Sequence, residues 1–418
     1  MLNQGFLIKN LKARQIFDSR GTPTVEVKLQ TKNGWVIDSA PSGASTGEKE
    51  ARELRDGKQE YWGKGVYQAV NNINEIITPA LLKKDVRHQR EIDHLLIDLD
   101  GTKNKSRLGA NAILPVSLAV SRAAAQALHL PLWRYLNNLY QSFSSHRQSE
   151  MPQPSFNILN GGMHAGNQLS IQEFMVVPLK ESFAENLKEG VEIYHALKEI
   201  LIKTKGGSEA NVGDEGGMAP SLTKTEEALD LLVAAIARTG FSGVKLGIDC
   251  AASEFYQGKN YFLDGQSLTQ DQLLSFYKKL TEKYTFLFLE DPFDEEDWTG
   301  FQKITENLGS ELIIIGDDLL TTNVRQIKEA AEKKAVNGVI IKPNQIGSLT
   351  ETLQAIASVQ KNQWKVMVSH RSGETNDDFI ADLAVGVGAD FIKTGAPARG
   401  ERVAKYNRLL AIEEEINE

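Results

Sequence analysis

The second half of the chain alternates short apolar runs with longer stretches that have helical spacing. The runs cover residues 244–248, 286–289, 312–316, 338–341, 366–369 and 391–392. Short apolar runs joined by helical segments are typical of buried parallel strands in an α/β fold. The pattern therefore predicts a β/α barrel in this part of the chain.

The first part of the chain has a different pattern. Residues 6–30 and 34–40 alternate as strands do, and residues 69–82, 89–99 and 111–128 carry apolar positions at helical spacing. This mixture predicts a smaller N-terminal α+β domain over residues 1–137. A polar, serine-rich stretch that ends in two prolines (QSFSSHRQSEMPQP) predicts a linker over residues 138–154, before a barrel over residues 155–418.

Polar residues stand directly where the apolar runs of the second half end. They are Asp249, Glu290, Asp317, Lys342, His370 and Lys393. The C-terminal ends of the strands of a β/α barrel meet at one mouth, so these side chains are expected to converge there. Unpaired charges near a dry interior cost free energy, and packing alone does not ask for them. The pattern predicts an active site.

Three of these residues favour a metal site. Asp249, Glu290 and Asp317 offer hard oxygen ligands on neighbouring strands, and the sequence has neither HExxH nor CxxC spacing, which favours Mg²⁺ over zinc. A single acid in such a position more often caps the following helix. Three at successive strand ends favour the metal.

The cationic residues at the strand ends suggest a base and an anionic substrate. Lys342 follows a buried strand, where burial and positive neighbours are expected to lower its pKa so that it acts as a base; a structural ion pair with the acids is the alternative. His370, Arg371 and Ser372 together offer donors suited to a phosphate or carboxylate, although such a triplet alone is usually surface polarity. Lys393 adds a second cation one strand later.

Two further acids and one loop are candidates for the same site. Glu215 lies in a glycine-rich loop, and Glu173 lies amid apolar neighbours where burial would raise its pKa, so either is a candidate general acid. Residues 42–47 (SGASTG) are small enough for a mobile lid, and a plain surface turn is the alternative.

Composition narrows the function classes. Hydrophobic residues make up 41% and charged residues 24% of 418, and the net charge of -8 offers no general attraction to nucleic acid or membrane. One cysteine, Cys250, and the lack of an apolar leader or membrane-length stretch lead us to expect a cytoplasmic protein. Motifs for dinucleotide binding, a P-loop or a GxSxG nucleophile are missing, which disfavours nucleotide and acyl chemistry.

Eleven motifs, in this order and at these separations, resemble those of the enolases across essentially the whole chain. They are DSRGTPTVE at 18–26, SGASTG at 42–47, LGANA at 108–112, NGGMHA at 160–165, QEFM at 172–175, GDEGG at 213–217, LEDPF at 289–293, GDDL at 316–319, IKPNQIG at 341–347, SHRSGET at 369–375 and IKTG at 392–395. Each motif alone is modest, and the ordered set is specific. The resemblance also implies a ββαα opening of the barrel, which the periodicity alone does not predict.

The resemblance implies reversible dehydration of 2-phosphoglycerate to phosphoenolpyruvate with two Mg²⁺ ions. It implies that Asp249, Glu290 and Asp317 hold the first metal and that Ser45 reaches the second as its loop closes. Lys342 would be the base and Glu215 the general acid, with Glu173 assisting. His164, Glu173, His370, Arg371, Ser372 and Lys393 would bind or position the substrate and its phosphate. Charge from the metals and Lys393 would stabilise the dianionic enediolate formed on proton removal.

The resemblance further implies a homodimer, and an octamer of such dimers stays open. The family usually carries arginine where Ala411 stands, and that arginine resembles one that pairs with the position of Glu26 across the dimer interface. Arg408, one helical turn earlier, is a candidate replacement. We therefore expect the dimer to be kept with a rearranged ion pair. Other unusual choices, Glu48-Lys49, Pro115 and Gly400, touch no assigned role.

Two alternatives differ in class. A superfamily dehydratase or cycloisomerase acting on sugar acids or muconate-like acids would not need the phosphate-binding set and Ser45. A non-catalytic or additional binding role, as a cell-surface plasminogen receptor from a surface or secreted pool, or as a part of an RNA-degrading complex, would be favoured if Lys342, Glu215 or Glu173 were replaced. All three are present.

Overall fold

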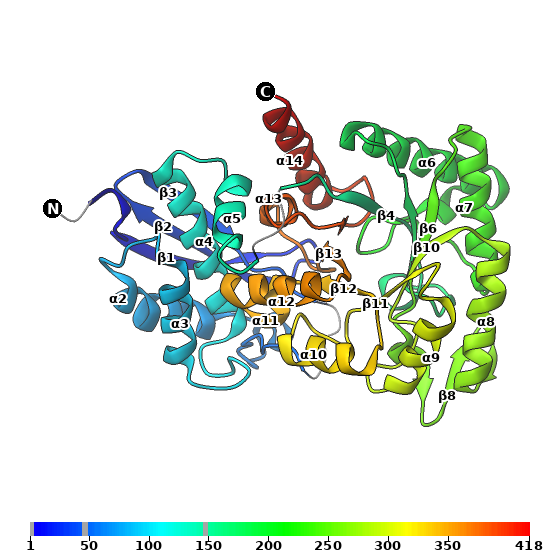
Figure 1. The fold of residues 1–418 in the computed structure, drawn as a ribbon, viewed down its shortest axis with the longest axis horizontal. Coiled ribbons are helices and arrows are strands. Elements are labelled where there is room, and N and C mark those ends of the chain that lie inside the picture. The colour runs from blue at the N-terminus through cyan, green and yellow to red at the C-terminus, as the bar shows by residue number, and fades with distance from the viewer. Residues whose placement is uncertain (1–3, 44–48, 145–148) are drawn as a thin grey trace.

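The computed structural model describes residues 4–43, 49–144 and 149–418, with only the backbone of His164. Figure 1 shows the N-terminal elements on one side of the molecule and the barrel with its helices on the other. The fold is mixed α/β and contains a closed eight-stranded barrel. The sequence predicted the barrel.

The N-terminal part is built on a three-stranded antiparallel sheet in the order β1-β2-β3. Its strands are β1 (Asn10–Phe17), β2 (Pro23–Thr31) and β3 (Gly34–Ser39). Alternation along β2 fully buries Val25, Val27 and Leu29 against the alanine-rich helix α4 (Ala110–Leu128). The remaining helical segments are η1 (Gln4–Phe6), η2 (Glu60–Gly63), α1 (Tyr67–Asn71), η3 (Asn72–Ile77), α2 (Thr78–Leu81), α3 (Gln89–Asp100) and α5 (Leu132–Tyr140).

The barrel closes in the strand order β10-β11-β12-β13-β14-β4-β5-β6. Its strands are β4 (Gln153–Asn160), β5 (Glu173–Val177), β6 (Lys245–Asp249), β10 (Phe286–Glu290), β11 (Ile313–Gly316), β12 (Gly338–Ile341), β13 (Lys365–Ser369) and β14 (Phe391–Lys393). All six apolar runs predicted as strands form strands within a residue or two of the expected bounds.

The barrel opens with two strands followed by two helices. β5 is antiparallel to both β4 and β6, whereas every other neighbouring pair is parallel. Helices α6 (Phe183–Thr204) and α7 (Thr225–Thr239) lie between β5 and β6 in the chain. The ββαα opening implied by the family resemblance is therefore present.

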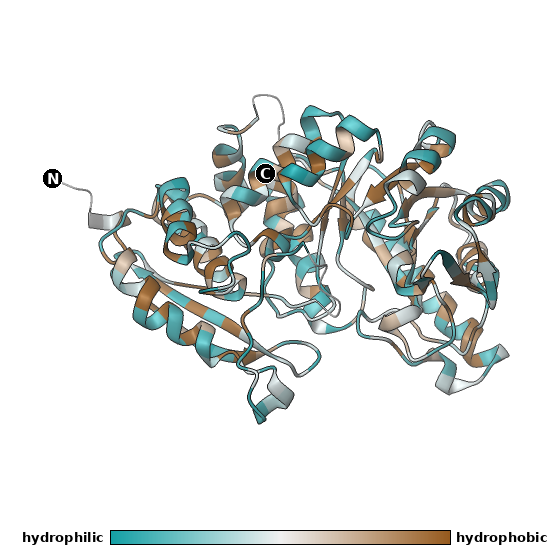
Figure 2. Cartoon of the chain, turned by 90° about the horizontal axis from the view of Figure 1, so that it is seen from below, coloured by the Kyte–Doolittle hydropathy of each residue, from teal (hydrophilic) through white to brown (hydrophobic). Residues whose placement is uncertain are grey.

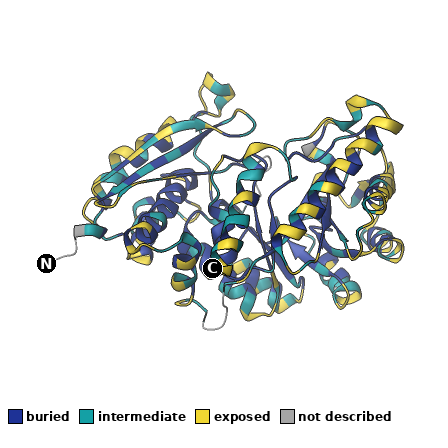
Figure 3. Cartoon of the chain, turned by 90° about the horizontal axis from the view of Figure 1, so that it is seen from above, coloured by how far each residue is buried: buried dark blue, intermediate teal, exposed yellow. Residues whose placement is uncertain are grey.

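Helices surround the barrel strands and face solvent on their outer sides. Figure 3 shows buried strands within helices that are exposed on one side, and Figure 2 shows the strands as largely hydrophobic. The later helices are α8 (Gln270–Lys283), α9 (Trp298–Leu308), α10 (Val324–Lys333), α11 (Pro343–Ile346), α12 (Leu349–Lys361), α13 (Phe379–Gly386) and α14 (Gly400–Asn417). Short elements complete the domain: η4 (Gly162–His164), η5 (Gly207–Ala210), η6 (Ala252–Phe255), β7 (Tyr256–Gln257), β8 (Asn260–Leu263) and β9 (Gln266–Leu268).

A separate apolar cluster fills the interior of the barrel. Its buried members are Met175, Val177, Phe288, Ile315, Ile340, Met367 and Phe391, which come from six of the strands. Inward-pointing residues alternate along a strand, so the next inward positions toward the C-terminal strand ends are the polar ones. Because apolar side chains fill the barrel interior, polar side chains can meet only at the C-terminal ends of the strands.

The two parts of the chain dock through hydrogen bonds at the start of α12. Asp93 of α3 accepts the backbone N–H of Thr350 at 2.9 Å, and Ser117 of α4 accepts that of Leu349 at 3.0 Å. Of the expected linker, residues 138–140 belong to α5 and residues 153–154 to β4. Among the described residues no single helix is long and apolar enough to span a membrane, although the bent pair α4 and α5 passes on length and composition alone.

Candidate active site

Three acids and a lysine converge at the barrel mouth. The Nζ of Lys393 lies 2.7 Å from Oε1 and 2.8 Å from Oε2 of Glu290, and 3.1 Å from Oδ2 of Asp249. It also lies 3.5 Å from Oε2 of Glu173. All four residues end or begin barrel strands and are almost fully buried. The convergence that the sequence predicted is present.

Burial and mutual repulsion shift the titration of this group. Burial, followed by the charge of Asp249, holds the pKa of Glu290 well above its usual range, even though Lys393 opposes the shift. Burial alone would lower the pKa of Lys393, but the surrounding carboxylates outweigh it and raise that pKa well above its usual range. The cluster has more acids than the lysine can neutralise, so it favours a further cation.

The structure corrects one expectation about Lys342. Burial is the largest single effect and acts to lower its pKa, as expected, but the neighbouring carboxylates, led by Asp317 in direct contact with Nζ, together outweigh it, and the net pKa is raised. Lys342 therefore stands in the ion pair that was its alternative reading. A base role requires this pair to loosen when substrate and metal bind.

Strained backbone supports Asp317 and Lys342 from below. Thr322 is buried with a left-handed φ of 53°, unusual for a β-branched residue, and its Oγ1 accepts the backbone N–H of Lys342 at 2.9 Å. The same hydroxyl donates to Oε1 of Gln345 at 2.8 Å, which turns the Gln345 amide so that Nε2 donates to Oδ1 of Asp317 at 3.0 Å. The Thr322 hydroxyl thus helps to hold the backbone of Lys342 and, through Gln345, the carboxylate of Asp317.

Asp291 orients Asp317 from the other side. Its two carboxylate oxygens accept the backbone N–H groups of Asp317 and Asp318, each at 2.8 Å. One oxygen of each of Asp291, Asp317 and Asp318 lies close enough to the others to hold a common metal ion. These three acids therefore place several oxygen donors close together, but both oxygens of Asp291 already accept backbone N–H groups.

Glu173 and Glu215 lie at the same mouth. Burial, followed by the charge of Glu215, holds the pKa of Glu173 well above its usual range, as the sequence predicted from its apolar neighbours. Glu215 accepts from Nδ2 of Asn157 at 2.9 Å and lies 3.4 Å from Nε2 of His370. Both acids line one pocket with Asp249, Asp317, Lys342, His370, Arg371, Ser372 and Lys393.

Arg371 and Ser372 are held by residues that the sequence reasoning did not single out. Glu50 accepts from Nη1 and Nη2 of Arg371 at 2.9 and 3.2 Å, and Asn344 accepts from Nη1 at 3.1 Å. Ser372 Oγ accepts from Nη1 of Arg20 at 3.2 Å. Their only sequence signal was membership of the quoted motifs or closeness to one, as for Glu50 just after residues 42–47.

Most of the predicted site residues are thus brought together. For two of them the structure gives no side-chain position: Ser45 lies outside the described residues, as does most of the proposed lid, and the side chain of His164 is not described. The assigned roles of all of them stay predictions.

This arrangement defines a β/α-barrel enzyme whose mouth combines buried acids, the amines of Lys342 and Lys393, and a buried arginine paired with Glu50. Comparison with known proteins makes the class specific. A model of the enolase C-terminal TIM barrel domain matches residues 148–418, and one of the enolase N-terminal domain matches residues 8–136.

Curated relatives agree over nearly the whole chain. Enolase from Methanocaldococcus jannaschii is 50% identical, over 99% of this chain and 97% of its own. Enolase B of Dictyostelium discoideum is 50% identical, and enolase of Solanum lycopersicum 49%, each over 98% of this chain and 95% of its own. The chain belongs to the enolase family. It is a carbon–oxygen lyase of the phosphopyruvate hydratase type.

Proposed function

We propose that this chain catalyses the reversible dehydration of 2-phosphoglycerate to phosphoenolpyruvate with two Mg²⁺ ions. The observation that carries the proposal is the position of Lys342 opposite Glu173. Lys342 follows β12 and Glu173 begins β5, and these strands lie on opposite sides of the closed ring. A substrate between them would meet an amine on one side and carboxylic acids on the other.

That placement suits an elimination in which a proton and a hydroxyl leave from adjacent carbons. Lys342 would take the proton from the carbon next to the carboxylate, and Glu215 would protonate the departing hydroxyl. Glu173, whose raised pKa favours its protonated form, would assist Glu215. Lys393 would remain close to the acids as a fixed positive charge.

The acids fit a hard divalent cation. Asp249, Glu290 and Asp317 offer only oxygen donors, and the raised pKa of Glu290 reflects first its burial and then carboxylate charge from Asp249 that Lys393 does not fully compensate. These three residues would hold one Mg²⁺, and Ser45 is the proposed ligand to the second. When bound, the ions supply positive charge that favours a carboxylate-stabilised carbanion. Positive charge beside Asp317 would also weaken its hold on Lys342.

The phosphate would lie beside Arg371 and Ser372. Arg371 presents the only fork geometry among the assigned site residues, and a fork matches two phosphate oxygens. Glu50 now occupies that fork, so an incoming phosphate would compete with a carboxylate for the same N–H groups. The phosphate requirement separates this proposal from a sugar-acid dehydratase.

The assignment of base and acid can be tested by separating proton removal from loss of hydroxyl. Lys342→Ala should lose both phosphoenolpyruvate formation and exchange of the C2 proton of 2-phosphoglycerate with deuterated water. Glu215→Gln should lose product formation and keep the exchange, which NMR of the substrate detects. Exchange that survives in Lys342→Ala would refute the role of Lys342 as base. Exchange that is lost in Glu215→Gln but kept in Lys342→Ala would reverse the two roles.

A further inference from the structure

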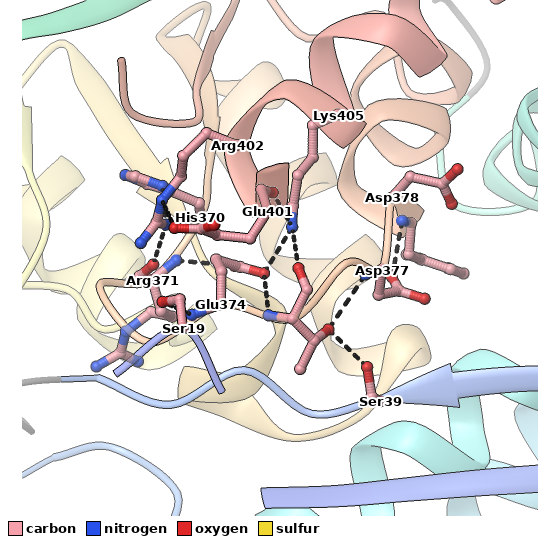
Figure 4. Close-up of polar contacts among 12 residues, drawn as sticks. Ser19, Ser39, His370, Arg371, Glu374, Asp377, Asp378, Glu401, Arg402 and Lys405 are labelled. Atoms are coloured by element: carbon pink, nitrogen blue, oxygen red, sulfur yellow. Dashed lines mark hydrogen bonds and ion pairs between the residues drawn. The ribbon is translucent and has the colours of Figure 1, made fainter. Parts of the chain in front are cut away.

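Arg402 is a fully buried arginine near the start of α14, and no role has been assigned to it so far. Its guanidinium contacts the active-site segment that holds His370 and Arg371 (Figure 4), and it also contacts the backbone of a second segment at Asp214. Nη1 donates to Nδ1 of His370 and to the backbone oxygen of Arg371, both at 2.7 Å. Nη2 donates to the backbone oxygens of Ser372 at 2.6 Å and Asp214 at 3.1 Å.

The contact with His370 determines where the imidazole carries its proton. A guanidinium has donors and no acceptor, so Nδ1 of His370 must be the unprotonated nitrogen. The hydrogen of the neutral ring therefore stands on Nε2. That nitrogen lies 3.4 Å from Oε2 of Glu215, the proposed general acid.

The surroundings of His370 keep the ring neutral. Burial is the main cause that lowers its pKa to about 4, and the charge of Arg402 adds to this effect, while Glu215 and Glu374 oppose it. A neutral ring has two tautomers of similar energy, and only a fixed partner selects one of them.

We propose that Arg402 is a positioning residue that locks His370 in the Nε2–H tautomer, and thereby directs a hydrogen-bond donor at Glu215. This inference rests on the proposed role of Glu215. Arg402 also joins the backbone next to Glu215, through Asp214, to the backbone of Arg371 and Ser372. The proton-donating acid and the anion-binding segment are therefore set by one side chain.

Lys405 provides a matched control on the same helix. It is buried like Arg402, and its Nζ donates to Oε2 of Glu374 and the backbone oxygen of Thr375, each at 2.8 Å. Replacing it removes a buried cation from α14 without touching His370. A general loosening of α14 would affect both variants, whereas loss of tautomer control would affect only Arg402 variants.

The test uses ¹⁵N NMR of the full chain labelled at histidine, with His370→Gln to assign the His370 signals. The wild type should show a protonated Nε2 and an unprotonated Nδ1. Arg402→Met should show a mixture of tautomers or the reversed one, and Lys405→Met should keep the wild-type pattern. Arg402→Lys, which retains the charge but not the fork, should show a partial shift and covers the case in which Arg402→Met does not fold.

Kinetics link the tautomer to the acid. Arg402→Lys should lower phosphoenolpyruvate formation by about ten- to a hundredfold while keeping exchange of the C2 proton, the pattern expected for Glu215→Gln. Combined with His370→Gln, it should have little additional effect, because both changes remove the same contact. His370 signals that stay unchanged in both Arg402 variants would overturn the proposal. A wild type with the Nε2–H tautomer but no turnover would refute the proposed function and leave the tautomer assignment intact.

Discussion

At the scale of single residues, each positively charged side chain of the site forms an ion pair with an acid of the same chain. Arg371 is held by Glu50, Lys342 by Asp317, and Lys393 by Glu290 and Asp249. Each buried charge needs such a partner, because a lone ion in the interior is costly. We therefore expect substrate and metal to bind by replacing some of these partners, with the metal compensating the excess of acids around Lys393.

His370 gives a residue-scale prediction about pH. Its pKa of about 4 in the folded chain is depressed, chiefly by burial, from about 6.5 in an unfolded chain. The folded state therefore binds fewer protons between these values, so stability present above pH 6.5 is lost as the pH falls toward 4. At pH 4.5 the loss from this group should be about 2 to 3 kcal/mol relative to pH 7.

The measurement is urea unfolding of the wild type and His370→Gln at pH 7 and pH 4.5. Other groups titrate in both proteins, so the difference between them isolates His370. The variant should lose about 2 to 3 kcal/mol less than the wild type on acidification. Equal losses would mean that the ring is already protonated in the fold or is not buried in solution.

At the scale of elements, hydrophobic patterning predicted where the barrel strands lie in the chain, but not the antiparallel pairing of β5 or the side-chain contacts made by distant segments. The predicted polar residues stand at or directly after the ends of β6, β10, β11, β12, β13 and β14, because alternation and barrel closure leave little choice of direction. The antiparallel β5 came only from family resemblance. Arg402, on α14, and Glu50, in the loop between β3 and η2, were missed because hydrophobic periodicity says nothing about contacts between segments so far apart in the chain.

The sign of the Lys342 shift shows the same limit. Burial and charged neighbours could be expected from its place after a strand, and burial does act to lower its pKa. The net direction depends on direct contact with Asp317, a geometry that sequence spacing does not specify. Three-dimensional distances decide between a free amine and an ion pair.

Helix α6 offers an element-scale prediction through Gly190. A Cβ at this position would clash with the ring of Phe156 on β4, which is fully buried. Alanine favours a helix by about 1 kcal/mol over glycine, but overpacking costs about 1 to 3 kcal/mol. Gly190→Ala should therefore lower the free energy of unfolding.

The matched control is Gly207→Ala, because nothing lies within 4 Å of a Cβ built there. Its stability should stay within about 0.5 kcal/mol of the wild type in chemical denaturation. A Gly190→Ala variant as stable as the control would show that α6 and β4 are packed more loosely than their contacts suggest.

At the scale of the whole molecule, the open question is assembly. Glu26 pairs with Arg14 of its own chain at 2.6 Å. Arg408, the suggested replacement for the arginine missing at Ala411, is engaged by Asp382 at 2.6 Å and by Glu415 at 2.7 Å within the chain. If Arg408 paired across an interface, it would have to break both of these contacts. Arg14 is more exposed and has a single ion pair, with Glu26, so a rearranged ion pair across the interface would more readily use Arg14.

We nevertheless predict a homodimer, as the family resemblance implies. Sedimentation velocity at micromolar concentration should show a species of twice the chain mass, and Arg14→Ala should weaken it if that residue turns to a partner. A monomer at micromolar concentration would refute the dimer. A larger species would favour the octamer.

The most direct test of the whole account is the initial rate of phosphoenolpyruvate formation from 2-phosphoglycerate, followed by ultraviolet absorbance with Mg²⁺ and with chelator. We expect turnover with Mg²⁺, loss of turnover on chelation and its return when Mg²⁺ is restored. A folded wild type with saturating Mg²⁺ and no turnover would contradict the assignment of Lys342, Glu215 and the three acids to this reaction.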